Sequence, residues 1–502
     1  MNVVLTRLPQ RAAPATIAAM ARTATAARPL GEALDAAPMT GRHLRFWLLA
    51  ALGILLDGFD FFIIAVANPL IAEDFDVDAN VKGLISSAAI VGAIFGAGVL
   101  GPLADRLGRR RIFKFDLWLF VVFSVACVFA WDVWSLIAFR FMLGLAIGMD
   151  YPIAASYLAE ILPAKGRGRW LVSAFSLQAV GILLGALVGV IVLLAWPEIA
   201  SWRVMLGFGA IPALIIIALR RGTPESPRWL AQNKREVEAV EIAESLTGWP
   251  VQVTDVDRTK HEEASEGLKA LFRPELFSRR WRRRTIFTAV PWFLMDIASY
   301  GVGIFTPTLL AAMALSGADA TFIADDIAST VGTAALDVFL VVGFAIAIFA
   351  VDRVGRVPLQ LGGFALMAAA LCLLALADDL PGGGEQHLVL VFLGFAVFNT
   401  FMNLGPNATT YALPAEVFPG EMRAAGHGFA AASAKLGAAL GVYLFPTLMD
   451  DLGTSAVLLV MAGCCALGFL VTLVFRIETR GRTLAEISGG EVAAIRPRPT
   501  PP

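Results

Sequence analysis

The sequence predicts an all-α membrane protein with twelve transmembrane helices in two related halves of six. Three observations predict this fold. The 502 residues are 58% hydrophobic and 16% charged, whereas soluble domains average about 25% charged residues. Twelve stretches are apolar over the roughly 20 residues that a spanning helix needs. Two charged motifs also recur one half-chain apart, which indicates a duplicated six-helix unit.

The predicted spans form two groups separated by a polar linker. In the first half they cover 44–70, 84–104, 112–131, 134–158, 170–195 and 203–220. In the second half they cover 285–312, 331–351, 358–377, 388–413, 424–448 and 454–476. The expected organisation is therefore a tail (1–41), an N-terminal bundle (42–221), a linker (222–284), a C-terminal bundle (285–476) and a second tail (477–502). The first tail is rich in Ala, Arg and Pro without helical periodicity, so we expect it to be disordered.

Loop charges predict the orientation. Basic residues gather in alternate loops and in the linker, among them Arg109, Arg110, Arg111, Lys165, Arg167, Arg169, Arg353 and Arg356. The opposite loops are acidic, with Glu73, Asp74, Asp76, Asp132, Glu198, Asp325, Asp378 and Asp450. The positive-inside rule places both termini and the linker in the cytoplasm. The abundance of Arg, Ala, Gly and Val is typical of a GC-rich bacterial genome, so the expected location is a bacterial inner membrane.

The repeated motifs lie in matching loops of the two halves. Asp105-Arg106-x-Gly108-Arg109 recurs as Asp352-Arg353-x-Gly355-Arg356, and the Glu160 and Arg167 pair recurs as Glu416 and Arg423. We expect these charges to form a cytoplasmic gate that pairs across the halves when that face is closed. Its predicted members are Asp105, Arg106, Arg109, Glu160, Arg167, Arg169, Asp352, Arg353, Glu416 and Arg423. Parallel repeats of this kind place a transport site between the halves, near the middle of the membrane.

Ionisable side chains inside the spans are candidates for function, because each costs at least about 2.5–3.5 kcal/mol at the bilayer centre. At about 1.5 Å of rise per residue, Asp60 can face Arg140, and Asp57 falls at a depth similar to that of Asp150. The first pair is either a static ion pair or a coupling pair. Without a fixed cation, the two carboxylates of the second pair favour sharing a proton, which predicts a proton carrier.

Three more features concern the second half. Trp292, Asp296 and Tyr300 follow the spacing i, i+4, i+8 and share one helical face, where nothing apolar satisfies the aspartate. Asn399, Asn403 and Asn407 form a second such stripe beside a Gly-Pro break, a feature that often marks binding sites in transporters. Lys435 lies deep inside a predicted span, whereas Lys114 is at the edge of one, and Lys435 is expected to offset an anion or an acid. Asp116 and Asp337 are expected near helix ends, with local partners.

The motifs resemble those of the major facilitator superfamily over about residues 42–487. Gly101-x3-Asp105-Arg106-x-Gly108-Arg109-Arg110 is similar to its loop signature, and Pro224-Glu225-Ser226-Pro227-Arg228 with Glu478-Thr479-Arg480-Gly481-Arg482 resembles the sugar-porter branch. Gly148-Met149-Asp150-Tyr151-Pro152, Trp292-x3-Asp296-x3-Tyr300 and Gly405-Pro406-Asn407 are most similar to phosphate:proton symporters. Met149 and Ala154 depart from the usual Gly and Ser, which leaves the identity of the anion open.

The resemblance implies a major facilitator fold and a proton-coupled symporter that works by alternating access. The implied substrate-binding residues are Tyr151, Gln178, Trp292, Asp296, Tyr300 and Asn407, and the implied proton-coupling residues are Asp57, Asp60, Arg140, Asp150 and Lys435. Gln178 is otherwise a lone amide that equally suits bonding between helices. The expected substrate is phosphate or another small anion or organic acid. A sugar:proton symporter and a non-transporting nutrient sensor remain alternatives.

The composition also predicts what the chain lacks. A net charge of −1 gives no basic field for nucleic acid. The four cysteines lie in apolar runs and the four histidines are scattered, so no metal, cofactor or enzymatic constellation is expected. The expected partners are the solute, protons and the lipid bilayer, and the expected state is a monomer.

Overall fold

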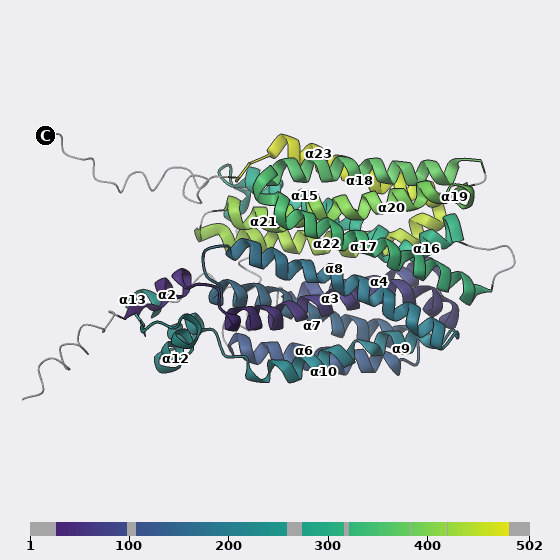
Figure 1. The fold of residues 1–502 in the computed structure, drawn as a ribbon. Coiled ribbons are helices and arrows are strands. Elements are labelled where there is room, and N and C mark those ends of the chain that lie inside the picture. Colours follow the sequence, from purple (N-terminus) through teal and green to yellow (C-terminus); the bar gives the residue numbers. More distant parts are fainter. Residues whose placement is uncertain are drawn as a thin grey trace, which may run out of the picture.

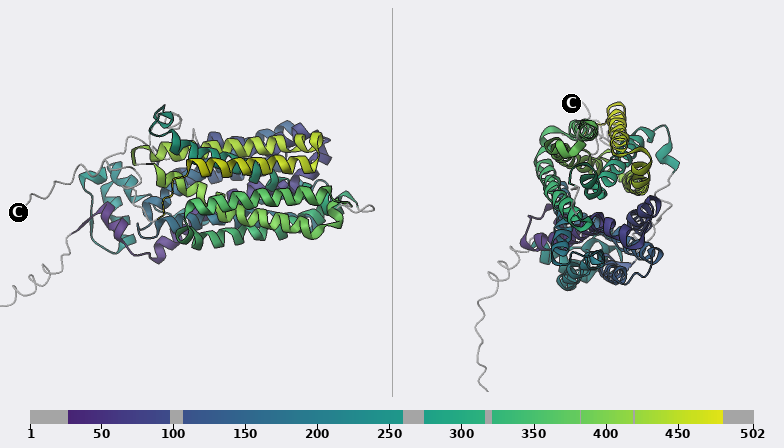
Figure 2. Two further views of the ribbon diagram at one scale, coloured as in Figure 1. Left: turned by 90° about the horizontal axis from the view of Figure 1, so that it is seen from above. Right: turned by 90° about the vertical axis from the view of Figure 1, so that its right-hand side faces the viewer.

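The structure is a computed structural model that describes residues 27–97, 107–258, 274–315, 321–381, 383–418 and 420–480. Helices dominate it, and the two halves of the chain form two bundles that lie side by side (Figures 1 and 2). Within these ranges, ten helices are long and apolar enough to cross a membrane. The shorter apolar helix α4 (Ala79–Phe95) and the helix α6 (Arg109–Val128) occupy two further predicted spans. Each of the twelve predicted spans therefore contains a helix, and the fold class predicted from the sequence is confirmed.

The first bundle follows the predicted order closely. Besides α4 and α6 it contains α3 (Gly41–Phe75), α7 (Val133–Ile161), α8 (Arg167–Ala195), α9 (Ser201–Phe208), α10 (Ala210–Leu219) and the short 3₁₀ turn η2 (Arg220–Gly222). Side-chain caps fix several starts, since Asp78 and Asp132 accept backbone N–H bonds at the beginnings of α4 and α7. Gly58 and Gly181 let α3 and α8 approach at backbone distance, because a Cβ at either position would lie 2.2 Å or less from a carbonyl oxygen of the other helix.

The second bundle contains two interrupted helices beside continuous ones. Its elements are α15 (Arg282–Ile304), α16 (Thr306–Leu310), η5 (Ala311–Leu315), α17 (Phe322–Val354), α18 (Arg356–Asp379), α19 (Gly383–Gln386), α20 (Leu388–Met402), η6 (Asn403–Asn407), α21 (Ala408–Val417), α22 (Gly420–Leu452) and α23 (Thr454–Phe475). The predicted break at Gly405-Pro406 is a π-helical turn, η6, because Pro406 has no N–H to continue the α-helical ladder.

A small subdomain covers one end of the bundles, which we call the linker end (left in Figure 1). Its elements are β1 (Arg28–Pro29), α2 (Leu30–Ala36), α11 (Pro227–Gln232), α12 (Glu236–Thr247), β2 (Val251–Gln252) and α13 (Asp255–Arg258). The 3₁₀ turn η4 (Pro274–Phe277) packs instead on α15 and α22 of the second bundle. β1 and β2 pair in parallel, with Arg28 opposite Val251. This subdomain therefore joins the start of the chain to the linker.

The prediction of a disordered tail is wrong for its described part, residues 27–41. Leu30, Ala33 and Leu34 lie on one face of α2 and are fully buried against Trp229 and Leu230 of the linker. The side chain of Asp35 pairs with Arg167 and Arg228, which anchors α2 to both the first bundle and the linker. The physical reason is that this short apolar face folds only against its tertiary partner, so it leaves no periodic signal long enough to detect.

Candidate functional site

A cavity of about 50 Å³ lies between the two bundles. It is larger than the roughly 10–15 Å³ that one water molecule requires, and therefore has room for a small group of atoms. Of the predicted substrate-binding residues, Gln178, Trp292, Asp296, Tyr300 and Asn407 line the cavity, and so does Lys435, which was predicted for proton coupling. The side chain of Tyr151 lies outside the described residues. The cavity thus brings together residues from α8, α15, η6 and α22, which are distant in the sequence.

A buried lysine and aspartate form the charged centre of the cavity. Lys435 on α22 places its Nζ 2.7 Å from the Tyr300 hydroxyl, to which it donates a hydrogen bond, and 3.8 Å from Oδ2 of Asp296. Asp296 is 3% exposed, and its Oδ2 has no hydrogen-bond partner. The lysine therefore balances the aspartate by charge but leaves it with unused hydrogen-bonding capacity toward the cavity.

Aromatic side chains enclose the cavity on both sides. Toward the linker end, the rings of Phe175 on α8 and Tyr411 on α21 lie 4.0 Å apart between centroids. Toward the opposite end, Phe61 and Phe62 of α3 contact the ring of Tyr300 at 6.1 and 5.9 Å. Each layer joins a residue of one half to a residue of the other. Separating the halves at either end would therefore open the cavity to that side.

The predicted asparagine stripe serves the helix packing more than the cavity. Asn399 and Asn403 donate through Nδ2 to the carbonyl oxygens of Leu336 and Leu340 on α17. Asn407 donates to Oδ1 of Asn403 at 2.6 Å and is the member of the stripe at the end nearest Tyr411. These bonds hold the π-helical turn against α17, which leaves Asn403 and Asn407 at the cavity wall.

The predicted pair of Asp60 and Arg140 forms a buried ion pair. Nη1 of Arg140 donates to Oδ2 of Asp60 at 3.1 Å, and both side chains are 1% exposed. The guanidinium Nε and Nη2 atoms of Arg140 have no hydrogen-bond partner. The depth estimate from the sequence thus brought the correct helices together, and the role of the pair in coupling stays a prediction.

The prediction that no fixed cation accompanies Asp57 and Asp150 is wrong for Asp150. Arg220, in η2 at the end of α10, reaches inward and pairs with Asp150 at 3.3 Å, while its Nε donates to the carbonyl of Leu49. Asp57, Asp116 and Asp150 line one small cavity, so Asp116 also lies in the interior instead of at a satisfied helix end. Sequence analysis missed Arg220 because it is the last residue of the predicted span 203–220 and precedes Arg221, as a charge at the cytoplasmic end of a helix would.

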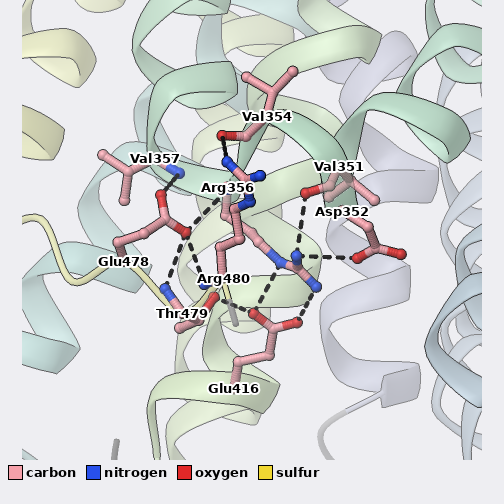
Figure 3. A network of polar contacts seen from close by, with 9 residues as sticks. All are labelled: Val351, Asp352, Val354, Arg356, Val357, Glu416, Glu478, Thr479 and Arg480. Carbon is pink, nitrogen blue, oxygen red and sulfur yellow. Dashed lines mark hydrogen bonds and ion pairs between the residues drawn. The ribbon is translucent and has the colours of Figure 1, made fainter. Parts of the chain in front are cut away.

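The charges at the linker end form two similar networks, one in each half. In the first, Arg109 pairs with Glu160 at 2.9 Å, and the carboxylate of Glu225 accepts the backbone N–H groups of Arg109 and Arg110. In the second, Arg356 pairs with Glu416 at 2.9 Å, and Glu478 accepts the backbone N–H groups of Arg356 and Val357 (Figure 3). A carboxylate thus caps the start of α6 and of α18 in the same way.

The predicted gate members Glu160 and Glu416 each pair with an arginine of their own half, and pairing of the gate across the halves stays a prediction. Arg356 also pairs with Asp352 in its own half at 3.1 Å, and Arg167 pairs with Asp35 of α2. Arg169 makes a contact across the halves, with its guanidinium 5.5 Å from the centre of the Phe349 ring. Asp105, Arg106 and the side chain of Arg423 lie outside the described residues.

The family model described as "Sugar (and other) transporter" matches residues 46–489 of this chain. The chain belongs to the sugar (and other) transporter family. The match covers both bundles, the linker and the duplicated charge networks. Among the described residues of this transporter, no group of three or more His, Cys, Asp or Glu side chains could hold a metal ion.

Relatives and solved structures extend the comparison. The chain is 30% identical to a putative inorganic phosphate transporter 1-13 of Oryza sativa over 94% of this chain and 98% of the relative. It is also 30% identical to the putative metabolite transport protein YaaU of Escherichia coli, over 90% of this chain and 96% of that protein. A partially occluded inward-open structure of the xylose transporter XylE from E. coli has a TM-score of 0.71 at 21% identity, covering 88% of this chain and 100% of that one. The similarity to the XylE structure shows that the two proteins share a fold.

The end opposite the linker is closed by backbone-level contact between α4 and α22. Thr447 donates to the side chain of Asn80 at 3.1 Å, and a Cβ on Gly83 would lie 2.3 Å from the carbonyl oxygen of Tyr443. We expect Gly83→Val to oppose this closure, because overpacking costs about 1–3 kcal/mol. The equilibrium should shift about 5- to 150-fold toward the form that is open at this end. To measure the shift, a cysteine is introduced into the cavity, and its rate of reaction with a thiol reagent added from that side is compared between variant and parent.

The matched control is Gly362→Val on α18, where no atom lies within 4 Å of the added Cβ. This variant should keep the accessibility and turnover of the parent. Equal accessibility in the Gly83→Val variant and the parent would show that the α4–α22 contact does not decide which end is open.

Proposed function

We propose that this transporter is a symporter that carries phosphate, or another small anion, together with protons by alternating access. The observation that supports this best is the Lys435–Asp296 pair in a small enclosed cavity, at 3.8 Å. A lysine provides the positive charge that an anion requires, and a nearby aspartate can take up a proton. The names of the Oryza relatives as inorganic phosphate transporters support phosphate within this class.

The proposed mechanism is a competition between the anion and Asp296 for Lys435. Ionised Asp296 holds the ammonium group and repels an entering anion. At about 4 Å and an effective dielectric of about 20, two unit charges interact by about 4 kcal/mol. Protonated Asp296 releases Lys435 and becomes a hydrogen-bond donor to an anion oxygen. The anion and the proton then bind as one linked event.

The acidic cluster of the first bundle is proposed to carry protons as well. Asp57, Asp116 and Asp150 face one small cavity, and Arg220 pairs with the last of them. One guanidinium cannot balance three ionised carboxylates in an apolar interior, so this cluster stays partly protonated while it is buried. Asp60 and Arg140 lie nearby as a closed pair. Proton release from the cluster requires water to reach it, which links protonation to the opening of one end.

The test is uptake into proteoliposomes with an imposed pH gradient. Radiolabelled phosphate, sulfate, a monocarboxylate and xylose are supplied separately at the same concentration. We expect phosphate to accumulate when the interior is alkaline and xylose not to accumulate. Accumulation of xylose in place of an anion would establish the sugar symporter instead, and binding without uptake of any solute would establish a sensor.

The proposed location is the inner membrane of a bacterium, with both termini and the linker end in the cytoplasm and the transporter acting as a monomer. Glu241 on α12 and Glu198 between α8 and α9 are exposed and lie at opposite ends of the bundles. In a background without the four native cysteines, Glu198→Cys should react with an impermeant maleimide added to whole cells, and Glu241→Cys should react only after lysis. The reverse pattern would invert the proposed orientation.

A further inference from the structure

A second cavity, of about 380 Å³, lies at the linker end between the start of α6 and the linker helix α12. This volume is within the roughly 300–1,000 Å³ that small-ligand sites occupy. The helix α6 contributes Arg110, Arg111 and Lys114, and the linker contributes Glu225, Arg235 and Glu238. None of these residues lines the central cavity. The cavity is therefore a separate site, and its wall is rich in charge.

The two carboxylates of this cavity are already engaged. Glu225 accepts the backbone N–H groups of Arg109 and Arg110 at 3.0 and 3.1 Å. Glu238 accepts two hydrogen bonds from the guanidinium of Arg235, at 2.8 and 2.5 Å. The linker side of the cavity thus balances its own charges, and neither carboxylate pairs with a side-chain cation of α6.

The three cations of α6 have no such balance. The guanidinium of Arg110 donates to the neutral carbonyl of Arg221 at 3.5 Å. The side chains of Arg111 and Lys114 are exposed, and within the described part of the chain they form no hydrogen bond or ion pair. Three positive charges on successive turns of one helix favour an anion between them and α12. Arginine binds phosphate well because its planar donors match two phosphate oxygens at once.

An apolar face of α6 continues directly from the basic residues. Arg111, Phe115, Trp118 and Val122 follow the spacing i, i+4, i+7, i+11 and therefore share one side of the helix. The three apolar members are 53%, 51% and 55% exposed, respectively. Since α6 is one of the spanning helices, this exposed apolar face contacts the hydrocarbon of the bilayer. A ligand that reaches both parts needs an anionic head and an apolar body.

The neighbouring helix α10 extends the same apolar surface. It packs on α6 and runs in the opposite direction, so its last turns lie beside the first turns of α6. Ile215 and Leu219 on these turns are 55% and 48% exposed. The basic cavity thus lies directly above a lipid-facing surface that two helices form.

We propose that the cavity between α6 and α12 binds the headgroup of an anionic phospholipid. The phosphate oxygens accept hydrogen bonds from Arg110, Arg111 and Lys114, and the acyl chains lie along the exposed face of α6. Clusters of basic residues beside a spanning helix attract anionic lipid headgroups in this way. A lipid in the cavity contacts both the first bundle and the linker, and so attaches one to the other. The inference goes beyond the proposed function and does not depend on which solute is carried.

The test is binding of phosphatidylglycerol to the delipidated full chain in a neutral detergent, measured by native mass spectrometry. Each basic side chain near an anionic lipid contributes about fivefold in affinity. We therefore expect Arg111→Gln/Lys114→Gln to weaken phosphatidylglycerol binding about 25-fold. Phosphatidylglycerol should also raise the unfolding temperature of the parent and raise that of the double variant much less, because the lipid joins two parts of the fold.

The matched control is Lys165→Gln/Lys234→Gln, which removes two positive charges from exposed lysines that do not line the cavity. This variant should bind phosphatidylglycerol as the parent does. Equal weakening in the two double variants would show a general effect of surface charge and overturn the site. Unchanged binding in Arg111→Gln/Lys114→Gln would overturn it as well.

Two further ligands test the class of molecule. Zwitterionic phosphatidylethanolamine should bind more weakly than phosphatidylglycerol, and inorganic phosphate at millimolar concentration should not displace phosphatidylglycerol from the parent. Equal binding of the two lipids would overturn the preference for an anionic lipid, and displacement by phosphate would assign the cavity to a soluble anion instead. Should the double variant fail to fold, a photoreactive phosphatidylglycerol is applied to the parent. Crosslinks should map to α6 or α12, and crosslinks found elsewhere would overturn the inference.

Discussion

Asp296→Asn is expected to bind phosphate at every pH and to lose the pH dependence that the parent shows. In the parent, phosphate affinity falls as pH rises through the pKa of Asp296, because the ionised carboxylate occupies Lys435 and repels the anion. The repulsion of about 4 kcal/mol estimated above corresponds to an upper limit of about a thousandfold in affinity. The amide in the variant is a permanent donor and cannot ionise. It should therefore bind phosphate at high pH as the parent binds it at low pH.

The same variant should lose accumulation driven by a pH gradient, since no proton accompanies the anion at this residue. Equilibrium binding across a pH series, measured together with uptake, separates the two effects. Asp379→Asn, at the exposed end of α18, is the control for the chemical change and should keep both properties. The mechanism fails at Asp296 if the variant binds no anion at any pH, or if its affinity stays as sensitive to pH as that of the parent.

Asp57→Asn and Asp150→Asn should both abolish uphill accumulation of phosphate while exchange at equal concentrations continues. The structure predicts that the two variants differ in stability. Asp57 has no fixed cation, so its replacement by an amide leaves no charge behind. Replacing Asp150 leaves Arg220 buried without its carboxylate partner. Breaking a buried pair in this way costs about 3–5 kcal/mol.

Thermal unfolding in detergent provides the measurement for this difference. Asp150→Asn should unfold at a clearly lower temperature than Asp57→Asn, and the double variant Asp150→Asn/Arg220→Gln should regain part of the loss because no charge remains unpaired. Uptake and exchange are measured on the same preparations. If either single variant still concentrates phosphate against its gradient, the proton-carrier role assigned to that residue is wrong.

The gate and the N-terminal segment mark where prediction from sequence stopped. The duplicated charges were evident from the repeat, yet their pairing within each half was not, because a repeat reveals equivalent positions but not the neighbours of either copy. Glu225 and Glu478 cap α6 and α18 from segments more than one hundred residues away in sequence. The helix α2 was missed because its three buried residues acquire a partner only when the linker folds beside them.

The sequence by itself determined the properties that depend on distance along one segment. Apolar length defined the twelve spans, and the fixed rise and turn of a helix placed Trp292, Asp296 and Tyr300 on one face and Asp60 near the depth of Arg140. Only the tertiary structure decided which charges meet across helices, such as Lys435 with Asp296 and Arg220 with Asp150. The reason is physical. Lipid-facing surfaces are as apolar as helix interfaces, so composition leaves the rotation and register of neighbouring helices open, and close packing determines them.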